Sequence, residues 1–241
     1  MTMAGAALAL AVTASRWSLH AGGGLVTATP EWRAEAGFTE FAEPGIVATR
    51  YVPHSAPGFE AGVWHGMTPH LGIALTVTRF DRDTAGDFVA LLPHPLYLAR
   101  PRSVGGALEV GSQRETAVHF GLAFSATRGG IVARLSGGPS YFLVGADVVD
   151  RVSYEHEYPY DAVRVTGLRR SAVRGDALGG HAALTLERRI AGRVAVGAGA
   201  RWSRATIPLI RAARPDEDAR ERSARVPAGG VNASAVIRLY F

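Results

Sequence analysis

The sequence predicts an all-β protein, an eight-stranded antiparallel up-and-down transmembrane β-barrel with short periplasmic turns and long extracellular loops. Apolar and polar residues alternate with period two in eight segments, as in strands whose two faces meet different surroundings. The connections between the segments are long and short by turns. Bacterial outer-membrane barrels typically have an even number of strands, with the short turns at one end and the long loops at the other.

The first three strands are expected at residues 17–25, 59–66 and 71–80. A long polar stretch with prolines separates the first two, whereas four residues separate the second from the third. The third strand alternates clearly, with leucine, isoleucine and valine on one face and glycine, alanine and threonine on the other. A tight turn therefore joins the second strand to the third.

The fourth and fifth strands are expected at residues 115–126 and 131–144, joined by a short turn. A long excursion precedes the fourth strand, and part of it could extend its neighbours. The fourth strand places Val118, Phe120 and Leu122 on one face, opposite polar or small residues. These two strands form the second predicted hairpin.

The last three strands are expected at residues 177–188, 194–207 and 232–241. A short turn joins the first two of them, and a long charged connection precedes the last. The final strand places alanine, isoleucine, leucine and phenylalanine on one face, and its other face is polar apart from Val236. The chain therefore ends in the middle of an alternating strand.

Composition excludes several other classes of protein. No stretch beyond the N-terminus approaches the roughly 18–20 consecutive apolar residues that a spanning helix needs. The absence of cysteine excludes disulfides, thiolate metal sites and cysteine nucleophiles. The formal net charge of +5 comes from arginines interleaved with acidic residues, without a basic cluster that carries aromatics, so we expect no nucleic-acid partner. Contact with anionic lipid headgroups suits the basic surface better.

The N-terminus predicts a secretory signal peptide over residues 1–14, followed by one barrel domain over residues 15–241. Residues 4–12 form a short apolar run, and Val12, Thr13 and Ala14 resemble a cleavage site. No lysine or arginine precedes the run, so we expect the true start to lie upstream of Met1.

With these features the chain resembles small bacterial outer-membrane β-barrel domains of the OmpA, OmpX and OmpW type, over nearly everything after the leader. Ile237, Leu239 and Phe241 match the C-terminal signal of that family, which the barrel-assembly machinery reads during biogenesis. The resemblance implies the bacterial outer membrane as location, with membrane lipid and lipopolysaccharide as surroundings. It implies no particular activity and no oligomeric state.

An eight-stranded barrel is just wide enough to be filled by its own side chains. We therefore expect the polar residues that face inward to form a hydrogen-bonded ion-pair network rather than line an open pore. The predicted network consists of His119, Arg134, His181, Glu187, Arg201 and Arg238. Trp17, Trp64, Tyr240 and Phe241 are expected in an aromatic girdle near the periplasmic end.

No residue pattern indicates catalysis. The lipid A deacylase type of small barrel places a histidine two residues before a serine on one strand, and none of the eight histidines here has that spacing. Glu155, Glu157 and Asp161 around His156 could suggest a metal ion, but consecutive charged loop residues are typically solvated. We expect no enzyme, no cofactor and no metal.

Three functions remain open at this point. The first is a structural or loop-mediated interaction role in the cell envelope. The second is a small transport barrel for hydrophobic or small solutes. The third is a soluble lipocalin-like barrel, in which the same alternation is turned inside out, with the arginines facing water and an apolar ligand inside.

Overall fold

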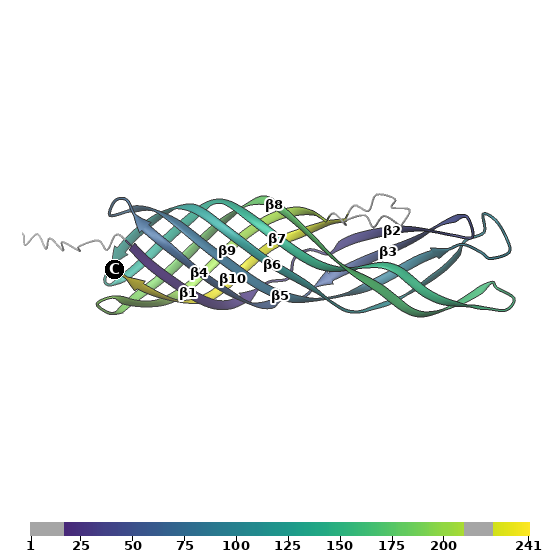
Figure 1. Ribbon diagram of the computed structural model, residues 1–241. Helices are drawn as coiled ribbons and strands as arrows, with labels where there is room; N and C mark the ends of the chain where they lie inside the picture. Colours follow the sequence, from purple (N-terminus) through teal and green to yellow (C-terminus); the bar gives the residue numbers. More distant parts are fainter. Residues whose placement is uncertain (1–16, 210–223) are drawn as a thin grey trace, which may run out of the picture.

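The computed structural model describes residues 17–209 and 224–241, so the predicted signal peptide lies outside the described part. Its strands are β1 (Trp17–Val26), β2 (Trp32–Glu40), β3 (Glu43–Pro53), β4 (Ala56–Gly66), β5 (Leu71–Leu92), β6 (Arg102–Arg128), β7 (Ile131–Glu157), β8 (Ala162–Ala191), β9 (Val194–Leu209) and β10 (Ala224–Tyr240). They form one elongated barrel (Figure 1).

Eight of these strands close into a ring in the order β1, β4, β5, β6, β7, β8, β9, β10, with antiparallel pairing throughout. The first and last strands close the ring, with Ser18 opposite Tyr240 and Val26 opposite Asn232. Closure leaves no open edge in this part of the sheet, so each backbone amide can find its partner in a neighbouring strand. The predicted eight-stranded up-and-down barrel is confirmed.

The polar stretch between the first two predicted strands folds into a further hairpin, β2–β3, which the sequence analysis treats as a loop. β3 pairs with the upper half of β5, from Thr84 to Leu91, whereas β4 pairs with its lower half. The hairpin therefore continues the wall beyond the end of β4, at the end of the barrel far from the C-terminus (Figure 1).

Much of the predicted long loops is strand. β5 and β6 stay paired from Leu71 opposite Phe124 to Leu92 opposite Arg102, with one irregularity near Thr84. β7 and β8 stay paired as far as Glu157 opposite Ala162. These hairpins carry the wall well past the apolar band and end together in a distal tip, whereas the short turns 67–70, 129–130 and 192–193 gather at the opposite, turn end.

An apolar band encircles the ring on its outside. Its large exposed members are Trp17, Leu19, Leu25, Phe59, Leu71, Leu75, Val77, Phe120, Leu122, Phe124, Ile131, Leu135, Tyr141, Leu143, Leu178, Leu184, Leu186, Val196, Trp202, Val231, Ile237, Leu239 and Phe241. Along β7 the band runs from Ile131 to Leu143. Twelve residue steps at about 3.4 Å, tilted by about 45°, span roughly 29 Å, which is close to the apolar height of about 25 Å in outer-membrane barrels.

Residues 17–209 and 224–241 contain no helix long and apolar enough to cross a bilayer.

The interior has two chemically different halves. Toward the turn end it is polar. Toward the tip it holds an apolar core, whose large members are Trp32, Val47, Tyr51, Phe88, Leu92, Leu108, Phe142, Val144, Val149, Val152, Val173, Ile207, Leu209 and Val226. The β2–β3 hairpin contributes Trp32, stacked on Tyr51 with the ring centroids 4.1 Å apart. The hairpin thereby helps to close the distal half of the barrel.

Candidate functional site

The structure places all six predicted network residues inside the barrel, where each side chain is buried. It does not join them into one network. Arg134, Glu187 and Arg238 form one cluster, the two histidines form a second, and Arg201 belongs to a third. Each cluster includes residues that the sequence analysis did not select.

The first cluster lies at the turn end and is centred on Glu187. Its carboxylate accepts hydrogen bonds from Arg134 at 2.5 Å and from Nε of Arg238 at 2.8 Å. The Tyr240 hydroxyl donates to the same carboxylate and accepts from Arg134, at 3.2 and 2.9 Å. Arg238 also donates to Ser18. Two guanidinium groups thus share one buried carboxylate, and each also donates to one neighbouring hydroxyl.

Two residues of the predicted aromatic girdle belong to this interior instead, which corrects that prediction. Trp64 and Tyr240 are 6% and 5% exposed, whereas Trp17 and Phe241 face outward. The Arg134 guanidinium lies 5.2 Å from the centroid of the Trp64 ring, within the range of cation–π contact. Strand alternation explains the result, because Tyr240 shares a face with Arg238 and not with Leu239.

The second cluster contains the two predicted histidines. Nδ1 of His119 and Nδ1 of His181 lie 2.8 and 3.0 Å from the Ser140 hydroxyl oxygen, and Nε2 of His119 lies 3.0 Å from the hydroxyl of Thr78. One serine proton can serve only one of the two imidazoles, so the other must donate its own Nδ1 proton to Ser140. Ser140 is 2% exposed, and Phe142 of the apolar core packs edge-on against His119.

The third cluster joins Arg201 to Glu60, at 3.1 Å, and Glu60 also accepts a hydrogen bond from Ser234. Glu60 is not among the predicted network residues, although its place between Phe59 and Ala61 in an alternating strand indicates an inward carboxylate. Farther toward the tip, the buried carboxylate of Glu115 accepts hydrogen bonds from the backbone N–H of Gly229, at 2.9 and 3.1 Å. Polar contacts therefore fill the lumen over several levels.

The apolar core covers these clusters on the side of the tip. Phe142, Ile207 and Val226 are each 0% exposed. They come from β7, β9 and β10, and β2 and β3 add Trp32 and Val47 to the same core. Close packing of this kind leaves few voids larger than a water molecule.

The distal tip is ordered around a buried arginine. Arg102 donates to Nδ1 of His156 at 3.1 Å, to the carbonyl of Tyr160 at 3.0 Å and to the carbonyl of Pro93 at 2.7 Å. Nδ1 of His156 must accept from the guanidinium, so this imidazole carries its proton on Nε2. His156, from the acidic segment considered for metal binding, thus lies against a cation. The Arg102 side chain therefore links the β5–β6 connection to the β7–β8 connection by hydrogen bonds.

A second contact ties the β2–β3 hairpin to the same tip. The Tyr154 hydroxyl donates to the carboxylate of Glu40. Burial and then this hydrogen bond raise the pKa of Tyr154, so the phenol keeps its proton at neutral pH. Between β2 and β7–β8 lies a cavity of about 570 Å³, with Glu40, Arg151, Glu155 and His156 among its lining. Phe41, Leu98 and Tyr158, in the connections that end the hairpins, are exposed by 46%, 80% and 87%.

The exposed C-terminal residues Ile237, Leu239 and Phe241 face outward on β10 and its end. The backbone N–H of Phe241 donates to the carbonyl of Trp17 at 3.1 Å, so the last residue remains tied to the first strand. Their role as an assembly signal stays a prediction.

Among solved structures the chain is similar to Neisserial surface protein A (NspA), with 11% identity, a TM-score of 0.44 and coverage of 94% of this chain and 98% of that one. It is also similar to Ail, the attachment invasion locus protein of Yersinia pestis, with 9% identity, a TM-score of 0.39 and coverage of 93% and 96%. A third likeness is to the outer membrane protease OmpT from Escherichia coli, with 9% identity, a TM-score of 0.41 and coverage of 93% and 97%. No family model matches the sequence, and no curated protein matches it.

The closed ring, the outward apolar band and the polar lumen are the features of an integral outer-membrane β-barrel. In this orientation the turn end faces the periplasm and the tip faces outward. The soluble alternative would leave a wide apolar belt in water, far larger than the patches that soluble monomers expose.

Proposed function

We propose that this protein is a closed, non-enzymatic outer-membrane barrel with a structural role in the envelope, and that its distal tip serves as an interaction surface. The observation that carries the proposal is the filling of the interior. Polar clusters occupy the half toward the periplasm, and an apolar core occupies the half toward the tip. An ion would have to cross both, and in the second it would meet closely packed apolar side chains such as Phe142, Ile207 and Val226, which cannot replace its hydration.

The absence of catalysis is also part of the proposal. The arrangement closest to a nucleophile and base is Ser140 with His119 and His181. Ser140 is 2% exposed and lies in the packed lumen, where both imidazoles occupy its hydroxyl and Phe142 of the apolar core packs against His119. The hydroxyl therefore acts as a bridge between two imidazoles in the packed lumen.

Planar-bilayer recording tests the closed lumen. We expect the reconstituted barrel to give no ion conductance, and vesicles that contain it to show no flux of small apolar solutes. Steady conductance or flux that collapses when His119 or Arg134 is enlarged or recharged would support the transport alternative and contradict ours.

The interaction surface is supported by the order of the tip. Arg102 and the Tyr154–Glu40 contact hold three hairpins in fixed positions, which lowers the entropy lost when a partner binds. A photo-crosslinking amino acid at Tyr158 should yield a discrete adduct in intact cells. The same group at Glu109, whose side chain is 93% exposed on the distal wall, should not. Equal labelling at both sites would contradict a tip-specific surface.

A further inference from the structure

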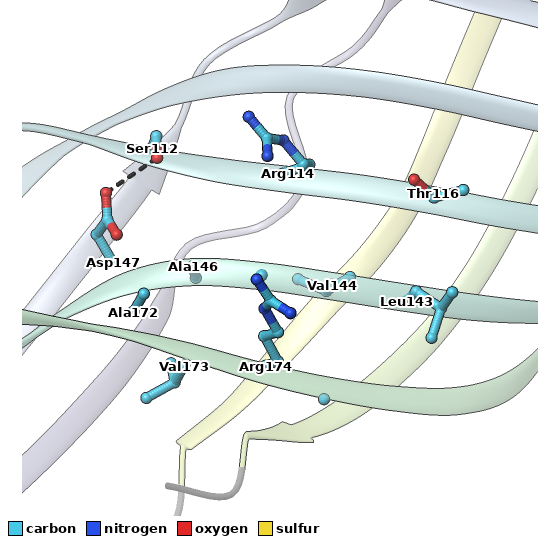
Figure 2. Close-up of a pocket in the computed structure, with 12 residues that line it drawn as sticks. Ser112, Arg114, Thr116, Leu143, Val144, Ala146, Asp147, Ala172, Val173 and Arg174 are labelled. Carbon is cyan, nitrogen blue, oxygen red and sulfur yellow. Dashed lines mark hydrogen bonds between the residues drawn. The ribbon is translucent and has the colours of Figure 1, made fainter.

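A cavity of about 380 Å³ lies on the outer face of the wall, over β6, β7 and β8 (Figure 2). It is separate from the lumen and from the tip. Its polar lining consists of Ser112, Arg114, Thr116, Asp147 and Arg174. Its volume falls within the range of about 300–1,000 Å³ that is usual for small-ligand pockets.

The pairing register explains the hollow. Arg114 lies opposite Gly145, and Gly145 lies opposite Arg174, so the three residues form one row across three strands. Neighbouring strands lie about 4.8 Å apart, which separates the two arginine backbones by roughly 10 Å. Between them Gly145 contributes no side chain. A Cβ at this position would meet its first neighbours, in Arg174 and Val173, only at 3.9 Å, so the floor of the row is open.

The two guanidinium groups are available from this side. Arg114 uses Nε to donate to Asp81 at 2.8 Å, which leaves its terminal nitrogens for the pocket. The guanidinium group of Arg174 forms no hydrogen bond or ion pair within residues 17–209 and 224–241. Asp147 accepts a hydrogen bond from Ser112 at 2.9 Å (Figure 2). The pocket thus combines cationic donors on one row with a hydroxyl and a carboxylate on the next.

The row also lies at a particular height. Two residues below it along β7 is Leu143, which is the outer end of the apolar band on this strand. Its position just beyond the band corresponds to the headgroup layer of the outer leaflet. Ligands that are concentrated at this height are the phosphates of lipid headgroups, and the planar guanidinium matches a phosphate in bidentate geometry.

We propose that this pocket binds the phosphate of an outer-leaflet lipid headgroup, with Arg114 and Arg174 as the phosphate ligands and Asp147 and Ser112 accepting hydrogen bonds from neighbouring headgroup hydroxyls. The inference rests on the outer-membrane placement and not on the closed lumen or the tip. It deepens the expected contact with lipopolysaccharide by assigning that contact to one site.

Native mass spectrometry of the folded barrel in nonionic detergent, titrated with lipid A, tests the proposal. We expect Arg174→Gln to weaken binding of the first lipid by about tenfold or more, because a charge-assisted contact is lost. Gly145→Val, which keeps every charge but fills the floor, should weaken binding similarly. Arg204→Gln removes an exposed arginine of β9 outside the pocket and should leave binding unchanged. Equal losses from Arg174→Gln and Arg204→Gln would replace the pocket with a diffuse basic rim and overturn the proposal.

Two further ligands identify the source of the phosphate. Dephosphorylated lipid A should lose the affinity that Arg174 provides, and inorganic phosphate alone should bind more weakly than lipid A. Inorganic phosphate that binds as tightly as the lipid would indicate a site for a free anion and contradict the lipid assignment.

Each variant is first compared boiled and unboiled on a denaturing gel. A retained heat-dependent shift shows that the barrel is folded, so a loss of binding then concerns the pocket and leaves the proposed function untouched.

Discussion

Glu187 illustrates how single residues hold the lumen together. It is 1% exposed and lies between Arg134 and Arg238, with Tyr240 bridging the carboxylate and Arg134. Charges taken out of water are stabilised only while their partners stay in place. The two arginines therefore depend on this one carboxylate.

Glu187→Gln should accordingly destabilise the barrel strongly, by about 3–5 kcal/mol, because two buried guanidinium groups lose their counter-charge. Urea unfolding of the protein in lipid vesicles measures the change. Glu109→Gln provides the control, since its carboxylate is exposed and 3.8 Å from Arg170, and such a surface pair is worth about 0–1 kcal/mol. Equal effects of the two substitutions would show that the Glu187 cluster is no more important than a surface pair.

At the scale of elements, the β2–β3 hairpin is the part that distinguishes this barrel from a plain eight-stranded ring. It pairs with β5 above β4 and places Trp32 and Tyr51 in the distal core. The hydroxyl of Tyr51 also accepts a hydrogen bond from the backbone N–H of Val149 on β7, across the barrel. The hairpin thus bridges opposite walls of the distal half.

Removing one large side chain should loosen this element without opening the ring. Trp32→Ala is expected to cost about 3–5 kcal/mol of local stability, because a buried aromatic is replaced by a cavity. Hydrogen exchange should accelerate in β2 and β3, while the heat-dependent gel shift of the ring persists. Phe41→Ala, at the exposed end of the hairpin, should change neither. Loss of the gel shift in Trp32→Ala would mean that hairpin and ring unfold as one unit.

For the whole molecule, the division of the interior into a polar and an apolar half decides what the barrel can do. The polar half lies within the apolar band, and the apolar half extends beyond it toward the tip. A pore needs a continuous polar path, and the proposed closed lumen follows from the apolar core that interrupts it. The elongated wall carries the tip away from the apolar band (Figure 1). Two predictions follow from this arrangement: planar-bilayer recordings should show no ion conductance, and crosslinking should be specific to the tip.

Biogenesis adds one prediction at the same scale. Deleting Phe241 should reduce the amount of heat-shifted barrel in outer membranes, because the residue directly follows β10 and its backbone N–H bonds to Trp17 where that strand closes on β1. Leu98→Ala, at an exposed position of the tip, is the matched control and should assemble normally. Quantitative comparison of the unboiled bands measures the effect. Equal assembly of both variants would contradict the role of the C-terminal residues.

The sequence by itself determined which segments form the ring and that the six predicted network residues face inward, because strand alternation is local and repeats in every membrane-spanning segment. The local pattern also indicates the strand β2, which was not predicted: Trp32, Ala34 and Ala36 alternate with the charged residues Arg33 and Glu35. Only the tertiary structure decided which inward residues meet. Arg134 and Tyr240 are 106 positions apart, and Arg201 and Glu60 are 141 apart. Such contacts depend on strand order and register around the closed ring, and alternation within one strand carries no information about either.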